Sequence, residues 1–559
     1  FIFEKLNVAP PQLLSDEGRV MVLRALLLRH ENELKLFRQS ARRPGFANQL
    51  IEWLRELQRH QITPQKLRSL AENKDLHAEL RDKLNDLALL HENYSGWLAE
   101  NKLQDANCLL DFAANSLREV FTTQNPKFKI QNLFLDGFAE MTPQELNLLA
   151  AILPFCENAM LAFCLDESAV SEKENSWLSI WNTVGKTFQQ CRQRIENLPD
   201  SKIEIEFLKR DSEKNRFAKN LELAQLEKFW QSPDESEKLK TQNSKLKIVG
   251  CTNPETEAVF AARAILKFVR AGNRFRDCGI IVRDLENYHK PLARIFRRYQ
   301  IPFFLDRRES VAHHPLAELT RGALRIVAFD WQHDDFFAAL KTGFCAAEEN
   351  QIDALENAAL EFGWHGKKWR EPLPDERFEP LRKKIFPPFE NFHAQISRTN
   401  FSPTGVQLAD FIRELWSDLN VETILENWSK EISDSTIQRF NDLTHSSVFE
   451  QMNLLLENLE LGFANEELPL RDWLPILESG LANLTVGVIP PVLDEVLIGA
   501  IDRARNPDLK FALVLGVNES VFPATPNAPL ILTETDRDEL QILLGPNLRE
   551  QISRENFYG

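Results

Sequence analysis

The sequence predicts an α/β protein in which two parallel-sheet units are joined by large helical segments. A short apolar run, residues 133–135, ends at Asp136 and is followed by a helical pattern and a second apolar run. A similar alternation begins near Lys245, and apolar runs of the same kind return close to the end of the chain. Strands that alternate with helical patterns are typical of parallel sheets, because a parallel connection needs a crossover. Glycine is scarce, 20 in 559 residues, which favours helix elsewhere.

Residues 1–118 carry the pattern of a helical subdomain. Apolar residues recur at helical spacing after Ser15, which can cap a helix N-terminus. The Arg-Arg-Pro-Gly run at 42–45 interrupts the helical pattern, and Thr63-Pro64 predicts the start of a further helix. A leucine stripe from Leu76 to Leu87 spans few heptads, so we expect a packed subdomain and not a coiled coil.

The first sheet unit follows. Residues 133–135 are short and apolar enough for a strand buried on both faces. Thr142-Pro143 predicts an N-cap and a first helical position, and the helix places Leu146, Leu149 and Ile152 on one face. A second apolar run covers 159–164. Asp136 then lies at the carboxyl edge of a parallel sheet, where ligands bind.

The residue after Asp136 decides what this edge could do. In a nucleotide-driven motor, an Asp at this place holds Mg²⁺ and the next residue is usually Glu, which orients the attacking water. Here that residue is Gly137, which has no side chain to polarise water. The pattern predicts a motor-like site that has lost its catalytic acid. The alternative is that Asp136 is only a polar residue at a strand end.

A phosphate-binding loop is not evident in the sequence. Gly185-Lys186-Thr187 resembles the end of such a loop, but Ile180 occupies the place of the required first glycine. Residues 177–194 instead carry the pattern of one helix, which makes the match a chance resemblance. No other GxxxxGK[ST] occurs in the sequence, and without this loop backbone N–H groups cannot cradle the β and γ phosphates.

The second sheet unit has basic residues where its strands end. The expected strands are 246–251, 279–282, 301–305, 495–499 and 511–516, with helices at 254–269 and 288–299 between the first three. We expect the strands at 279–282 and 301–305 to form a parallel pair. Arginines follow the strands, and strand-end arginines suit anionic ligands such as phosphates: Arg283, Arg307, Arg308, Arg503 and Arg505. The alternatives are a solvated turn for Arg307-Arg308 and structural ion pairs for the others.

Residues 313–480 are predicted to be mostly helical. Aromatic residues are frequent there, including Phe336, Phe337, Trp364 and Trp369. Aromatic side chains beside basic residues can stack on bases, but the core of a helical subdomain is the favoured interpretation.

Composition narrows the class of protein. A net charge of −16 argues against one broad DNA-coating surface, although a local basic channel needs only a few placed cations. No apolar run approaches the roughly 18 residues of a membrane span, and Phe1–Glu4 lacks the start of a signal peptide. The seven cysteines show no CxxC spacing and indicate reduced thiols of a cytoplasmic protein. A chain that begins at Phe1 is expected to be part of a longer one.

Several motifs, in this order, resemble one family. Residues 133–138 are similar to a degraded motif II of UvrD-type superfamily 1 helicases, 279–284 and 299–308 to motif IV and its continuation, and 502–505 with 515–523 to motif V and the next strand. Together with His313-His314-Pro315 they resemble the AddB (RexB-type) family, the B subunit of the bacterial ATP-dependent helicase/deoxyribonuclease. The resemblance covers nearly the whole chain.

The resemblance implies two RecA-like domains with helical insertions. The expected segments are a 1B-like helical subdomain at 1–118, the end of the first RecA-like domain at 119–243, the start of the second at 244–330, a 2B-like insertion at 331–480, and the end of the second at 481–559. It also implies a vestigial nucleotide site at Asp136, Gly137 and Arg283, and DNA contacts by Arg307, Arg308, His313, His314, Arg503 and Arg505.

The family further implies a function in which AddB pairs with an AddA-type motor and nuclease subunit at double-strand DNA ends. Its helicase-like part guides single-stranded DNA and takes part in Chi recognition for recombinational repair, in the bacterial cytoplasm at the nucleoid. Mg²⁺ and a 4Fe–4S cluster belong to a C-terminal nuclease domain. This sequence lacks the phosphate loop, motif VI, the nuclease residues and the cluster cysteines, so we expect no cofactor on it. An active superfamily 1 helicase and a DNA-free interaction scaffold remain the alternatives.

Overall fold

The computed structural model describes two compact units. It covers residues 1–123, 129–171, 179–199, 201–208, 217, 220–231, 246–431, 439–487, 494–503, 509–524 and 531–544. Unit 1 comprises residues 1–10, 59–61 and 107–252, and unit 2 comprises 11–58, 62–106 and 253–559. The five segments expected from the family resemblance stay a prediction.

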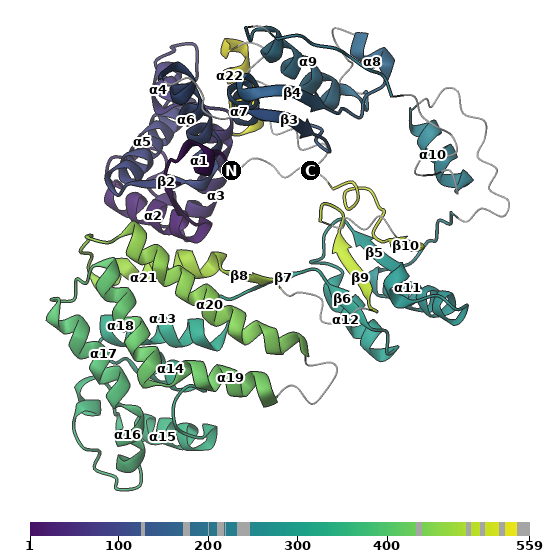
Figure 1. The fold of residues 1–559 in the computed structure, drawn as a ribbon. Coiled ribbons are helices and arrows are strands. Elements are labelled where there is room, and N and C mark those ends of the chain that lie inside the picture. Colours follow the sequence, from purple (N-terminus) through teal and green to yellow (C-terminus); the bar gives the residue numbers. More distant parts are fainter. Residues whose placement is uncertain are drawn as a thin grey trace. The chain divides into compact units, whose positions relative to one another are not determined.

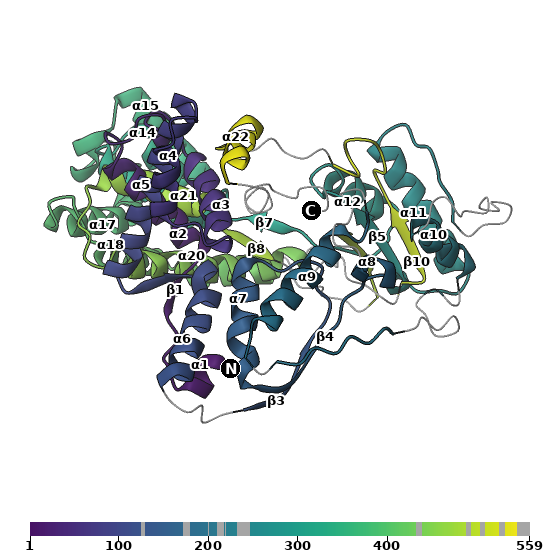
Figure 2. The same ribbon diagram turned by 90° about the horizontal axis from the view of Figure 1, so that it is seen from above.

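Unit 1 is an α/β unit built on two parallel strands. Strands β3 and β4 pair with Leu133 opposite Ala159 and Phe134 opposite Met160. Figure 2 shows the two strands with α7 and α9 beside them. The elements are α1 (Ile2–Leu6), α6 (Leu109–Thr123), β3 (Ile130–Leu135), α7 (Pro143–Ile152), β4 (Cys156–Leu161), α8 (Glu167–Ser171), α9 (Asn182–Glu196) and α10 (Leu221–Gln231).

The local signals of this unit are confirmed, but one burial expectation is wrong. Thr142 forms a capping box with Glu145, and Pro143 occupies the first turn of α7. The expected burial of the 133–135 strand on both faces is wrong, because Phe134 is 69 % exposed and its cross-strand neighbour Met160 is 61 % exposed. Only one face of the pair packs on a core, which contains Leu146, Leu149 and Cys191.

Unit 2 contains a four-stranded parallel sheet in the order β10-β5-β9-β6. Helices α11 and α12 share its apolar core (Figure 1). The elements are α11 (Pro254–Arg270), β5 (Cys278–Val282), α12 (His289–Arg298), β6 (Phe303–Leu305), β9 (Val496–Ala500) and β10 (Phe511–Val514).

Three sequence expectations for this sheet need correction. Strands β5 and β6 are parallel but not neighbours, because β9 from the end of the chain inserts between them. Strand β10, which the apolar run at 511–516 predicts as a buried strand, lies at the edge of the sheet and is only half-buried. Residues 246–250 are exposed and form no strand, and Ile248 is 98 % exposed. The apolar composition of a run of residues did not by itself predict whether that run pairs with another strand.

The first helical part of unit 2 follows its predicted caps. Ser15 accepts a hydrogen bond from the Gly18 N–H at 3.3 Å, and Thr63 accepts one from the Lys66 N–H at 3.3 Å. Helix α2 packs against α5, and β1 pairs with β2 in parallel. The elements are β1 (Gln12–Leu14), α2 (Asp16–Arg29), α3 (Phe46–Arg59), α4 (Pro64–Ala71), α5 (Ala78–Glu100) and β2 (Leu103–Asp105).

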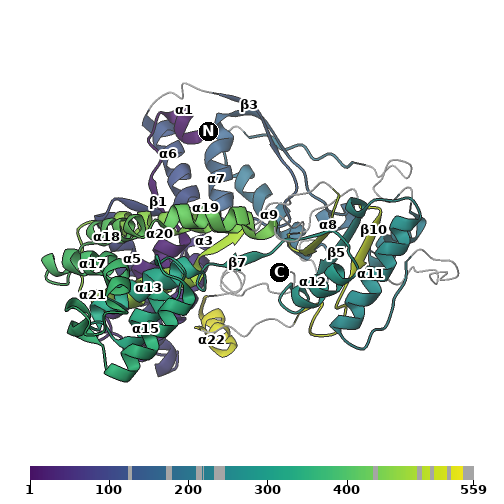
Figure 3. The same ribbon diagram turned by 90° about the horizontal axis from the view of Figure 1, so that it is seen from below.

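The second helical part of unit 2 confirms the core interpretation of its aromatics. Phe336, Trp369 and Phe389 are at most 1 % exposed. Figure 3 shows α13 close to α21, and the two helices are in contact. The elements are β7 (Arg308–Ser310), α13 (Pro315–Ala328), α14 (His333–Leu340), α15 (Glu349–Phe362), α16 (Glu379–Ile385), α17 (Pro387–Arg398), α18 (Gly405–Asp418), α19 (Val421–Glu431), α20 (Arg439–Gly462), α21 (Leu470–Asn483), β8 (Thr485–Gly487) and α22 (Glu534–Leu544).

The β7–β8 pair and helix α22 complete unit 2. Strand β7, directly after β6, pairs antiparallel with β8. Helix α22 begins after Thr533, whose hydroxyl caps it by accepting a hydrogen bond from the Asp536 N–H at 3.2 Å. Within the described residues, no helix combines the length and the apolar character that a bilayer crossing requires.

Candidate nucleotide and nucleic-acid sites

The loop after β3 places Asp136 and Gly137 at an exposed strand end. The Gly137 N–H donates a hydrogen bond to the Asp136 Oδ1 at 2.7 Å. Phe138 then packs edge-on against Phe163, with ring centroids 5.0 Å apart. The carboxylate is therefore engaged with its own loop, while the next ring anchors the loop to the chain beyond β4.

The backbone conformation at position 137 favours glycine. Its φ is +78°, which L side chains rarely adopt. No heavy atom lies within 4 Å of the place of an added Cβ, so space does not exclude a side chain there. A glutamate at this position would have room but would have to hold a strained backbone. The positive φ thus favours glycine over a residue with a side chain at this position.

The Gly185-Lys186-Thr187 run has a structural role. It lies inside α9, as predicted, so its backbone N–H groups are not arranged as a phosphate cradle. The Thr187 hydroxyl donates to the Ala139 carbonyl at 3.0 Å. This bond ties α9 to the loop that follows Asp136.

The carboxyl edge of the unit 2 sheet carries the predicted arginines. Arg283 follows β5 and is half-buried. Arg503 follows β9 and pairs with Asp306, which follows β6, at 2.9 Å. Arg307 lies 3.5 Å from Glu286. Arg503 therefore forms the kind of ion pair given above as its alternative, whereas Arg307 pairs with Glu286 and does not lie in a purely solvated turn. The contacts of these arginines with DNA stay a prediction.

The arginine pairs at this edge are open to water. The side chain of Arg503 is 46 % exposed and that of Asp306 is 36 % exposed. Exposed pairs of this kind contribute at most about 1 kcal/mol, so a phosphate can compete for the guanidinium. Arg505 lies outside the described residues.

The remaining predicted DNA contacts have different surroundings. Arg308 is exposed on β7 and His313 is exposed just before α13. The His314 ring is the N-cap of α13, where its Nδ1 accepts from the Leu316 N–H at 3.1 Å. Its Nε2 lies 3.0 Å from the Nδ1 of His445 on α20. Burial and then the nearby His445 lower the pKa of His314 to about 4, so at neutral pH the ring is an uncharged structural cap.

Neither implied cofactor fits the described residues. Across the ranges given above, no three His, Cys, Asp or Glu side chains gather as a metal site would require. Iron–sulfur clusters need thiolates, yet burial raises the pKa of Cys191 and Cys278 to about 11 and that of Cys345 to about 12. The assignment of Mg²⁺ and a cluster to a nuclease domain stays a prediction.

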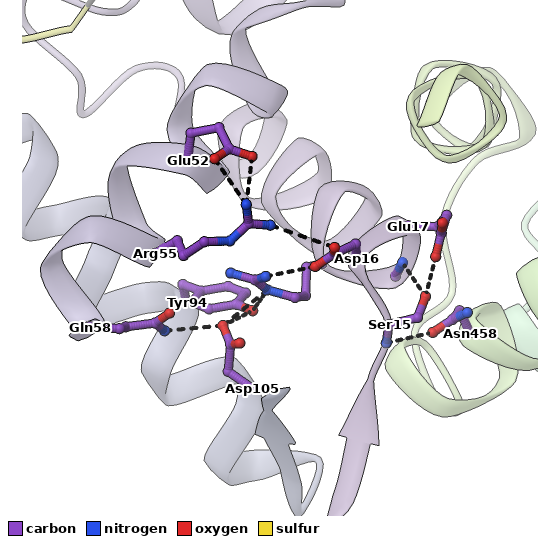
Figure 4. A network of polar contacts seen from close by, with 11 residues as sticks. Ser15, Asp16, Glu17, Glu52, Arg55, Gln58, Tyr94, Asp105 and Asn458 are labelled. Atoms are coloured by element: carbon purple, nitrogen blue, oxygen red, sulfur yellow. Dashed lines mark hydrogen bonds and ion pairs between the residues drawn. The ribbon is translucent and has the colours of Figure 1, made fainter. Parts of the chain in front are cut away.

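Sequence reasoning missed a buried polar network in the first helical part of unit 2 (Figure 4). The Nε of Arg19 lies 3.0 Å from the Oδ2 of Asp105, and both side chains are at most 1 % exposed. The same oxygen accepts from the Tyr94 hydroxyl at 2.9 Å and from the Gln58 amide at 3.0 Å. Burial, followed by the charge of Asp105, raises the pKa of Tyr94 well above its usual value. These residues are far apart in the sequence, and no local pattern links them.

Comparison with known proteins gives the same family over the whole chain. Residues 1–227 match the family described as "ADDB, N-terminal". A protein of Desulforudis audaxviator is 31 % identical over the full chain, one of Desulforamulus reducens 29 % identical over the full chain, and one of Symbiobacterium thermophilum 30 % identical over 98 % of it. All three are named as the B subunit of an ATP-dependent helicase/deoxyribonuclease. The chain spans 49 % of the length of each.

Parallel sheets with large helical insertions are consistent with the RecA-like architecture of helicase-related proteins. Within that class, the chain matches the AddB family: its first 227 residues match the family model, and its whole length is similar to proteins named as B subunits of ATP-dependent helicase/deoxyribonucleases.

Proposed function

We propose that the chain is the helicase-like part of a B subunit that guides single-stranded DNA without driving translocation. One observation carries the proposal. Gly137, with a φ of +78°, follows Asp136 at the end of β3, where a motor would hold its water-orienting Glu. Since the described Gly185-Lys186-Thr187 run is helical, it offers no cradle for the β and γ phosphates either.

The strand-end arginines of unit 2 support a role in guiding DNA. The carboxyl ends of β5, β9 and β6 meet at one edge because all three strands are parallel. Arg283, Arg307 and Arg503 follow these strands. Their guanidinium groups can take phosphates in exchange for carboxylates, with an affinity that falls as salt rises.

For the whole protein, the proposal extends to the complex. The relatives are named as B subunits, which implies that each has a partner. We propose an AddA-type helicase/nuclease as the partner of this protein, double-strand DNA ends as the substrate, and a part in Chi recognition during recombinational repair. Mg²⁺ and a 4Fe–4S cluster would serve a nuclease domain and not the residues described above.

The experiment measures binding and hydrolysis on the same protein. We expect the chain to bind a single-stranded oligonucleotide and to hydrolyse no ATP when DNA is added. Arg503→Ala combined with Arg505→Ala should weaken binding and flatten its salt dependence, by about 0.7 in the log–log slope for each phosphate that is no longer neutralised. Arg377→Ala, on the exposed side chain that pairs with Asp375, is a matched control.

The outcomes separate the alternatives. DNA-stimulated ATP hydrolysis would establish an active motor and overturn the proposal. Failure to shift a single-stranded oligonucleotide in electrophoresis would favour the DNA-free scaffold. Unchanged affinity and salt slope in the double variant would reject the arginine edge as the DNA contact.

A further inference from the structure

The helical part of unit 2 holds a cavity of about 860 Å³ that none of the predicted sites uses. This volume lies in the range of small-molecule and nucleotide sites. Three separate segments line the cavity: the end of α13 with the loop to α14, the loop between α17 and α18, and the start of α21. Its side chains include Arg325, Phe329, Asp330, Asp334, Phe401 and Arg471.

The cavity combines exposed aromatic and guanidinium groups. The guanidinium carbons of Arg325 and Arg471 lie 5.2 Å and 5.6 Å from the centroid of the Phe329 ring. Phe401, on the loop between α17 and α18, is 41 % exposed. Flat rings and guanidinium planes are the groups on which unpaired bases stack in single-stranded nucleic acid sites.

Both loops that reach the cavity hold strained backbone. Asp330 and Trp331 have φ values of +54° and +56°, and Asn400 and Phe401 have +51° and +57°. Non-glycine residues rarely adopt this conformation, and those that do occur preferentially at sites such as ligand clamps. Hydrogen bonds keep the second loop in place, with the Leu470 N–H donating to the Phe401 carbonyl at 2.9 Å. This hydrogen bond, from the start of α21, holds the backbone of residue 401 beside the cavity despite its strained conformation.

The charges of the cavity point to a base and not to a phosphate. Arg325 is neutralised by Asp335, with its Nε 2.5 Å from the Oδ1. Arg471 is exposed and forms no ion pair with any described residue, while Asp330 and Asp334 add two acceptors. Carboxylates accept hydrogen bonds from the exocyclic amino groups of cytosine, adenine and guanine, which thymine lacks.

We infer that this cavity binds one unstacked base of single-stranded DNA and prefers bases that carry an amino group. Phe401 provides the stacking surface, Asp330 and Asp334 accept from the amino group, and Arg471 contacts one neighbouring phosphate. The inference rests on the proposed function, because the proposed DNA guidance brings a single strand to this unit. It adds a second place of contact, distinct from the strand-end arginines.

The test compares the affinity of the full chain for dC12 and dT12 oligonucleotides by fluorescence anisotropy. The wild type should bind dC12 about 5- to 150-fold more tightly, since one good base contact is worth about 1–3 kcal/mol. Phe401→Ala should bring the ratio of the two affinities close to one and leave the salt slope unchanged. Asp330→Asn with Asp334→Asn should also lower the ratio, and Asn tolerates the positive φ at 330. Arg471→Ala should reduce the salt slope by about 0.7.

One control variant, one fluorescence measurement and one check of folding keep the result specific. Phe362→Ala removes another exposed phenylalanine of the same helical part, 50 % exposed and not in the cavity lining, and should bind like wild type. An oligonucleotide with 2-aminopurine at one position should lose fluorescence on binding, and Phe401→Ala should restore it. Thermal melting checks that Phe401→Ala and Phe362→Ala are folded.

Defined results overturn the inference. Equal affinity of the wild type for dC12 and dT12 rejects the cavity as a base site, and so does an unchanged affinity ratio in Phe401→Ala. A cavity that binds a peptide instead of a base would give the same results. If the Arg503 and Arg505 variant still flattens the salt slope, only the cavity proposal fails. If neither oligonucleotide binds the wild type, the proposed function fails as well.

Discussion

Two arginine–aspartate pairs of nearly equal length have opposite surroundings. Arg19 and Asp105 lie 3.0 Å apart and are at most 1 % exposed, whereas Arg503 and Asp306 lie 2.9 Å apart and are 46 % and 36 % exposed. Breaking a buried pair leaves an uncompensated charge away from water, while an exposed pair exchanges readily with solvent ions. Distance alone therefore does not indicate what a pair does. The buried pair holds the fold together, and the exposed pair is available to a ligand.

The largest expected effect is on the buried pair. Asp105→Ala should lower the free energy of unfolding by about 3–5 kcal/mol, because Arg19 loses its partner and the hydrogen bonds from Tyr94 and Gln58 disappear. Urea unfolding followed by circular dichroism measures the change. A loss below about 1 kcal/mol would show that water reaches the network.

A pair of intermediate burial should have an intermediate effect. Lys83 on α5 and Asp536 on α22 lie 2.8 Å apart, with side chains 10 % and 2 % exposed. Lys83→Ala should cost about 1.5–3 kcal/mol, the range for hydrogen bonds to charged groups. It should also make α22 more sensitive to limited proteolysis. Lys35→Ala, whose partner Asp82 is exposed, is the control and should change neither.

Lowering the pH should decrease the stability of the buried region before the carboxylates become protonated. Burial lowers the pKa of His91 to about 4, against the charge of the nearby Asp105. A histidine with a depressed folded pKa stabilises the fold while it is neutral, so stability falls as pH drops from about 6.5 to about 4. His91→Gln should remove part of this slope, on the order of 1–3 kcal/mol across the window. Unfolding free energies at pH 7 and pH 4.5 test the prediction.

The smallest expected change in stability is at the exposed pair, where binding should change instead. Asp306→Ala should alter the unfolding free energy by less than about 1 kcal/mol. It frees the Arg503 guanidinium, so the affinity for single-stranded DNA should rise about two- to fivefold, consistent with that small energy. Anisotropy titration at two salt concentrations measures it. Weaker binding by this variant would mean that Asp306 positions Arg503 for its ligand.

Local signals were predictable from the sequence, and distant pairings were not. Ser15, Thr63 and Thr142 were all predicted at helix starts, because a cap and its partner lie within three residues. The place of β9 between β5 and β6 depends on strands about 200 residues apart, which no periodicity encodes.

The candidate sites divide in the same way. Asp136 and Gly137 are adjacent, so their strand-end position followed from the pattern, although the positive φ of Gly137 did not. Arg503 and Asp306 are 197 residues apart, and the cavity is formed by three segments, so neither arrangement could be derived before the fold was known.

The contact between His314 and His445 also fixes where the protons of both rings are. Because the Nδ1 of His314 accepts from the Leu316 N–H, its proton must reside on Nε2. That Nε2 then donates to the Nδ1 of His445, which leaves the His445 proton on its own Nε2. Both imidazoles are thereby held in a single tautomer, and the bond between α13 and α20 has a direction. A side chain that only donates, such as lysine at position 445, would set two donors against each other and separate the two helices at this point.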